Sequence, residues 1–243
     1  MTGTARREDA LALKLADGLR FEAGPDTWSV PPLTVAEGEW VALVPGQAEP
    51  VVDPSVHLAR ALASLTEPER GRVEILGVDI YGTDYAMRQR TRARIGFVHG
   101  YGGLLSNRTV RENLTLPVSV HRKLTAAHES DTVESALVEF ALERVADLYP
   151  HQMDGATRWR ACLARALVLE PGWLVLEGLG DFEMDRGRGV GWTRLVERAL
   201  GGRIGAAVCL PRQNPGFEAW FKEHEGVVVS YSQVPGAARG RNT

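Results

Sequence analysis

Short apolar runs alternate with helical patterns along most of the chain. Residues 40–44 form a continuous apolar run after a turn at 37–39, which is typical of a buried central strand. A loop at 45–54 and a helical pattern at about 55–65 follow this run. Strand, loop and helix in this order hold a phosphate-binding loop in many nucleotide-binding folds.

The same alternation continues towards the C-terminus. Further strands are predicted at 11–15, 72–76, 94–98, 173–176, 203–210 and 226–230. Residues at about 107–149 carry an amphipathic helical pattern, and another helix is predicted at about 155–168. Strands and helices that alternate around a mostly helical block predict an α/β core with a helical insertion.

We expect one domain over residues 1–243. Its α/β core takes in about 10–98 and 170–232, and its helical subdomain takes in about 99–169. The tail at 235–243 is rich in glycine and arginine, and it is predicted to be disordered.

Composition is that of an ordinary globular protein and excludes several functions. The net charge of -3 and the pI of about 6.1 lack the basic excess of a nucleic-acid-binding domain. No stretch reaches the roughly 20 apolar residues that span a bilayer, and residues 1–9 do not resemble a secretory signal, so we expect a cytosolic protein. Cys162 and Cys209 lie in apolar runs and are predicted to be buried, reduced thiols.

Four segments, in order, resemble motifs of ABC-transporter ATPases. In the clearest, at 149–167, Arg160 and the run 163–167 are similar to the helix after the family's signature motif. Residues 171–177 resemble the proline, apolar strand and acid of Walker B, and residues 94–114 resemble the segment around the Q-loop. The stretch after the P-loop helix is matched by Leu65, Pro68 and Gly71.

This resemblance covers about residues 10–230. Residues 102–105 and the pattern at 158–166 are most similar to the ATPases of MCE-type lipid transporters, the Mla branch. The resemblance implies an ABC-ATPase-like P-loop NTPase core, in which helices flank a mixed sheet, with an inserted helical subdomain.

The resemblance also implies a Walker A loop at 45–55. That motif needs glycines so that backbone N–H groups can approach the phosphates, a lysine for the β- and γ-phosphates, and a Ser or Thr for Mg²⁺. Gly46 is kept, but the lysine position falls on Ser55, and Val56 and His57 follow it. The loop is longer than the motif and contains no lysine.

Other residues of this loop oppose phosphate binding. Its three prolines lack N–H donors, and Glu49 and Asp53 would repel a triphosphate. We expect a remodelled connecting loop, with an unusual phosphate-binding loop as the alternative. Ser55 is predicted to be the N-cap of the next helix. His57 or Arg60 could supply a cation, although both are expected on that helix.

The Q-loop and signature positions are also altered. Gly100 stands at the Q-loop glutamine, after His99, which we expect to be a loop residue, with a polar contact as the alternative. Asp154 stands at the signature serine and would place a carboxylate beside the phosphate of a partner subunit's ATP. Gly155 is kept, and Asp154 is predicted to cap the helix that follows.

Glu177 is the retained Walker B-like acid, but Gly178 stands at the catalytic glutamate. Glycine has no group that could accept a proton, so we expect no catalytic residue and no metal site. Three acids follow in what we expect to be a solvated loop, and one of them could substitute: Asp181, Glu183 and Asp185.

Two further nucleotide contacts of the family have weak candidates. Arg212 stands near the switch histidine and is read as a surface residue, with a phosphate contact as the alternative. Phe21 or Trp28 could stack on adenine, and core packing is an equal interpretation of either.

The site residues of the family are lost, whereas the scaffold residues between them resemble the family. This selective loss predicts that the fold is kept for packing against a partner. The resemblance implies a permease transmembrane subunit and a second ATPase subunit as partners, in a homodimer or heterodimer, with no nucleic acid and with membrane contact only through the permease. We expect a pseudo-ATPase subunit of an ABC transporter, peripheral on the cytoplasmic face of the bacterial inner membrane, with a lipid as its cargo. Binding of the family's ATP and Mg²⁺ is expected to be weak or absent. The alternatives are an active ATPase with unorthodox site residues and a regulatory protein outside any transporter.

Overall fold

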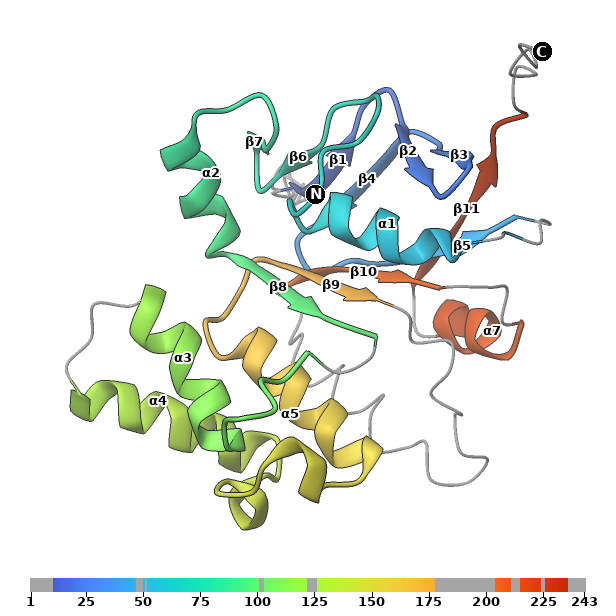
Figure 1. The fold of residues 1–243 in the computed structure, drawn as a ribbon. Helices are drawn as coiled ribbons and strands as arrows, with labels where there is room; N and C mark the ends of the chain where they lie inside the picture. Colours follow the sequence, from blue (N-terminus) through green and yellow to red (C-terminus); the bar gives the residue numbers. More distant parts are fainter. Residues whose placement is uncertain are drawn as a thin grey trace, which may run out of the picture.

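A mixed β-sheet forms the centre of the computed structural model, which describes residues 11–46, 50, 52–100, 103–121, 126–177, 204–210, 215–223 and 226–235 (Figure 1). Its strands lie in the order β2-β3-β11-β5-β10-β9-β8. They are β2 Leu19–Ala23, β3 Asp26–Val30, β5 Trp40–Pro45, β8 Ile95–Val98, β9 Trp173–Glu177, β10 Gly205–Cys209 and β11 Val227–Gln233. From β11 to β8 the neighbours run parallel, so the carboxyl ends of these strands meet at one edge.

A smaller antiparallel sheet, in the order β4-β1-β6-β7, covers part of one face. Its strands are β1 Leu11–Leu15, β4 Leu33–Ala36, β6 Glu74–Ile75 and β7 Val78–Asp79. The described helices are α1 Pro54–Leu62, α2 Tyr85–Arg92, α3 Val110–His121, α4 Ala126–Glu139, α5 Gly155–Leu167 and α7 Pro215–Glu223. The helical pattern at 107–149 is therefore divided between α3, α4 and a short 3-10 helix, Glu143–Val145.

The central strands are buried on both faces, because successive side chains point to opposite sides of a sheet. On β5, Val41 and Leu43 belong to the apolar cluster around α1, while Ala42 and Val44 belong to the cluster around α3, α4 and α5. Figure 1 shows α1 on one side of the sheet and the other three helices on the opposite side. Burial on both faces explains the continuous apolar run at 40–44.

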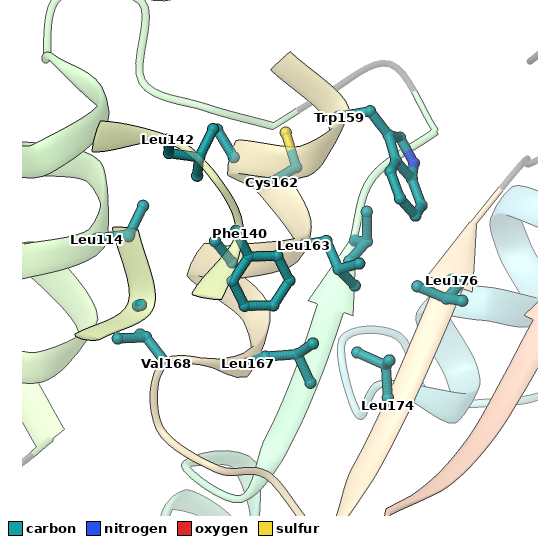
Figure 2. Packing of buried hydrophobic residues seen from close by; sticks show 14 of the residues in the cluster. Leu114, Phe140, Leu142, Trp159, Cys162, Leu163, Leu167, Val168, Leu174 and Leu176 are labelled. Atoms are coloured by element: carbon teal, nitrogen blue, oxygen red, sulfur yellow. The ribbon is translucent and has the colours of Figure 1, made fainter. Parts of the chain in front are cut away.

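Helix α5 joins the helical subdomain to the sheet. Leu163 and Leu167 on α5 lie between Phe140 and the β9 side chains Leu174 and Leu176 (Figure 2). All five side chains are at most 8% exposed. This packing fixes α5 against the strand that carries Glu177.

The C-terminal end of α1 is held by two aromatic side chains. The indole N–H of Trp173 donates to the carbonyl of Leu62 over 3.1 Å. The hydroxyl of Tyr81 lies 2.8 Å from the carbonyl of Ala61 and 2.6 Å from that of Thr66. Helix α1 is thus fixed to both the central sheet and the segment that leads into α2.

None of the helices in the described part of the chain is long and apolar enough to cross a bilayer. Residues 236–243 of the predicted tail lie outside the described residues.

Candidate functional site

The N-terminus of α1 is capped by Asp53. One Oδ of Asp53 accepts a hydrogen bond from the backbone N–H of Ser55 over 2.8 Å, and Pro54 occupies the first helical turn. The prediction that Ser55 is the N-cap was therefore wrong by two residues. Asp and Ser are about equally good N-caps, and the carboxylate adds a favourable interaction with the positive end of the helix dipole.

Ser55, at the lysine position, is fully buried, and its hydroxyl has no hydrogen-bond partner among the described residues. Val56 and His57 are half-buried on α1. Two of the chain's three lysines are described: Lys14 pairs with Glu74 on the small sheet over 3.6 Å, and Lys222 is exposed on α7. Neither lysine occupies the N-terminus of α1.

The loop before α1 is held against its neighbours at both ends. The backbone N–H of Gly46 donates to the carbonyl of Tyr231 on β11 over 2.7 Å. Val52 packs so closely on Gly24 that a Cβ at position 24 would lie 2.6 Å from a methyl of Val52. Contacts within the chain thus fix Gly46 and Val52. Glu49 lies outside the described residues.

A second polar contact lies where β8 and β9 end. Val98 pairs with Leu176 in the parallel register, so His99 and Glu177 are neighbours. Nδ1 of His99 lies 3.1 Å from Oε1 of Glu177, whose side chain is only 2% exposed. The alternative reading of His99, a polar contact rather than a plain loop residue, is the one the geometry supports. Gly100 lies just beyond this contact and is half-buried.

Glu177 and Asp53 both act on the thiol of Cys209. The carboxylates of Glu177 and Asp53 both add to the effect of burial in raising the pKa of the Cys209 thiol on β10. The second carboxylate oxygen of Glu177 is buried and has no hydrogen-bond partner among the described residues. Two carboxylates and a half-exposed imidazole therefore stand where a triphosphate and its cation would be needed.

Asp154 caps α5 as predicted. Its carboxylate accepts from the backbone N–H of Thr157 over 2.7 Å and lies 3.3 Å from the Thr157 hydroxyl. This backbone hydrogen bond is the main cause of a lowered pKa of Asp154. Gly155 is exposed, and a Cβ there would meet nothing within 4 Å. The α5 N-terminus thus carries its own ionised carboxylate.

The aromatic candidates for adenine stacking belong to the core. Phe21 is 3% exposed and Trp28 is 0% exposed, and both pack on Tyr231. The core-packing interpretation is therefore confirmed for both. The thiols of Cys162 and Cys209 are buried and form no disulfide, as predicted.

Several predicted positions lie outside the described residues, and their placement remains a prediction: Gly178, Asp181, Glu183, Asp185 and Arg212.

An apolar groove lies between β8 and the helical subdomain. Its volume is about 400 Å³, and its walls include Phe97 of β8, Leu116 and Val120 of α3, and Leu169 and Pro171 after α5. We call it the β8–α3 groove. The charged and ionisable residues along its walls are all basic: Arg92, His121 and Arg165. No sequence pattern indicates this groove directly, because its walls come from three separate segments of the chain.

The central sheet is mixed and buried on both faces, a loop and a helix follow its central strand, and a helical subdomain packs on one face. These features are typical of an α/β domain of the P-loop nucleotide-binding type. Solved ABC cassettes have this fold. The dimeric bacterial ABC transporter cassette MJ0796 aligns with a TM-score of 0.69 at 19% identity, over 92% of this chain and 99% of that one. The cassette cbiO1 from Clostridium perfringens aligns with a TM-score of 0.64 at 20% identity, over 84% of this chain and 79% of that one.

Residues 57–177 match the family model described as ABC transporter. The sulfate/thiosulfate import ATP-binding protein CysA of Synechocystis is 34% identical over 145 residues, which is 60% of this chain and 38% of that protein. The lipoprotein-releasing system ATP-binding protein LolD 1 of Rhodopirellula baltica is 33% identical over 145 residues, which is 58% of this chain and 63% of that protein. Over residues 57–177, about half of its length, the chain is therefore similar to the ATP-binding proteins of ABC transporters. It covers less than two thirds of the length of either relative.

Proposed function

We propose that this chain is a pseudo-ATPase subunit of an ABC transporter, which contributes its fold to the complex and does not hydrolyse ATP. The observation that carries the proposal is the capped N-terminus of α1. Asp53 accepts the N–H of Ser55, which in a phosphate-binding loop would be free for a phosphate oxygen. Pro54 removes another N–H donor at the same place.

The residues at this site do not fit Mg-ATP. A phosphate at the N-terminus of α1 would have to displace the Asp53 carboxylate or lie beside it, and no lysine offsets the repulsion within the described residues. A further buried carboxylate, Glu177, has His99 as its partner. Asp154 closes the N-terminus of α5 in the same manner, which opposes the binding of a phosphate presented by a second subunit.

We propose that the β8–α3 groove receives a helix from a permease subunit. Its apolar walls carry two exposed side chains, Leu116 at 46% and Val120 at 66%, which a docked helix would cover. Such a subunit would lie on the cytoplasmic face of the inner membrane and touch the bilayer only through the permease. A second ATPase subunit, either a copy of this chain or an active relative, would complete the dimer.

The cargo that we propose is a lipid. This choice rests on the similarity of residues 102–105 and 158–166 to ATPases of MCE-type lipid transporters. One relative, LolD 1, is named for lipoprotein release, while CysA is named for sulfate and thiosulfate import. The cargo is therefore the narrowest part of the proposal, and a lipid-transfer assay on the assembled transporter would test it.

Calorimetric titration with Mg-ATP tests the pseudo-ATPase directly. We expect no binding heat up to millimolar nucleotide, which corresponds to an affinity weaker than about -4 kcal/mol. LolD 1, titrated under the same conditions, is the positive control. Micromolar binding, at about -8 kcal/mol, would instead support the active ATPase with unorthodox residues.

Co-purification with candidate permease subunits tests the groove. We expect Val120→Asp on α3 to abolish co-purification, because it places a charge on an apolar contact. Val138→Asp on α4 is a matched control, since Val138 is 63% exposed and lies outside the groove. Equal loss with both variants, or with neither, would contradict docking at this groove. A stable chain that never co-purifies with a permease would support the regulatory alternative.

A further inference from the structure

The Glu177 side chain needs a positively charged or hydrogen-bonding partner, because a buried carboxylate without one is strongly destabilising. His99 is the one side chain of the described residues that hydrogen-bonds or ion-pairs with it. The other oxygen of Glu177 is buried without a hydrogen-bond partner there. Within the described part of the chain, the Glu177 carboxylate therefore depends on its contact with His99.

His99 is fixed on two sides for this contact. Its ring packs edge-on against Phe97, with ring centroids 5.0 Å apart. Gly103 lies against its other side, and a Cβ at Gly103 would come within 3.1 Å of the His99 Cβ. Gly103 also has a positive φ of 73°, which favours glycine. The backbone and the aromatic neighbour thus hold the imidazole beside Glu177.

We propose that His99 serves as a built-in hydrogen-bond partner for Glu177, in place of a bound divalent cation. The contact ties the end of β8, from which the chain enters the helical subdomain, to the end of β9 in the core sheet. Because both partners belong to one chain, this tie persists without nucleotide or metal. This role of His99 rests on the proposed function, because it applies to a subunit in which no Mg-ATP binds beside Glu177.

A double-mutant cycle with and without divalent cations tests the inference. The variants are His99→Ala, Glu177→Gln and the pair together, each followed by thermal unfolding in EDTA. We expect His99→Ala to lower Tm by about 6–20 °C, because it leaves a buried carboxylate unpaired. The double variant should lose clearly less than the sum of the single losses, because it leaves no unpaired charge.

Added Mn²⁺ gives the second readout. We expect 5 mM Mn²⁺, a concentration of roughly the order at which weak carboxylate sites fill, to raise the Tm of the His99→Ala variant. The Tm of wild type should not change, because His99 already contacts the Glu177 carboxylate. The Tm of the double variant should not change either, because that variant lacks the carboxylate. His121→Ala, a change of an exposed histidine on α3, is the matched control.

Additive single effects, or a wild type that Mn²⁺ stabilises as much as the His99→Ala variant, would overturn the inference. If His99→Ala does not fold, His99→Gln replaces it, because glutamine keeps an N–H donor for the Glu177 carboxylate; it should show a smaller loss with the same non-additivity. Neither readout depends on ATP. Failure here and failure of the proposed function are therefore separate results.

Discussion

Replacement of Asp53 by alanine removes the side chain that caps α1. The backbone N–H of Ser55 then loses its acceptor, while Pro54 keeps the helix start in place. Asp53→Asn is the matched variant, because asparagine is an equally good cap but carries no charge. The two variants separate the hydrogen bond from the charge at the helix dipole.

The cap hydrogen bond is worth about 1 kcal/mol, in the middle of the range for an N-cap changed to alanine. The interaction of the charge with the dipole of α1 adds roughly 0.3–1 kcal/mol at low salt. Asp53→Ala should thus lower the free energy of unfolding by about 1–2 kcal/mol, which is a Tm decrease of about 2–8 °C for a chain of this size. Asp53→Asn should lose only the dipole part.

Urea unfolding at low and high salt is the assay. Salt screens the dipole interaction, so the gap between wild type and Asp53→Asn should close in about 1 M NaCl. The gap between Asp53→Asn and Asp53→Ala should persist, since it reflects the hydrogen bond. If Asp53→Ala and wild type unfold at the same urea concentration at both salt concentrations, Asp53 does not cap α1. The main argument against phosphate binding at this helix would then fail.

Three further predictions concern the α5 cap, the core and the thiols. Asp154→Ala should cost about 1 kcal/mol at pH 7. The lowered pKa of Asp154 gives stability above the ordinary carboxyl pKa, and this is lost as pH falls through the folded value, so the difference in urea unfolding should shrink between about pH 5 and pH 3. Leu163→Ala should cost about 2–5 kcal/mol by chemical denaturation, whereas Leu65→Ala, at a residue 53% exposed, should cost less than about 0.5 kcal/mol. Burial raises the pKa of Cys162 to about 11 and also raises that of Cys209, so a thiol reagent at about pH 8 should react with neither until the chain unfolds; rapid reaction of the native chain would contradict their burial.

The central strands could be predicted from the sequence because burial on both faces leaves a continuous apolar run. The small sheet could be predicted less well. The pattern at 72–76 predicted a strand of five residues, but only Glu74 and Ile75 pair. Leu76 and Gly77 both have positive φ, 51° and 78°, and form the two-residue turn of a tight hairpin. Leucine is rarely found in that conformation, so the sequence pattern did not predict a turn at Leu76.

The candidate site shows the same division between local and long-range information. The cap of α5 is local, and Asp154 was predicted correctly. The cap of α1 is equally local, since an aspartate followed by proline is a common helix start, but similarity to the lysine position drew the prediction to Ser55. The contact between His99 and Glu177 depends on β8 and β9 being neighbours in a given register, which residues 78 positions apart could not reveal.

The attachment of α1 at both ends has a consequence for how this chain can change over generations. Asp53 holds the start of the helix, and Trp173 and Tyr81 hold its end. A phosphate-binding loop at this place would need the N–H groups at the start of α1 to be free, and freeing them removes the stabilising Asp53 cap. Under the proposed function, loss of nucleotide binding would therefore reinforce itself, because selection for stability works against losing the Asp53 cap.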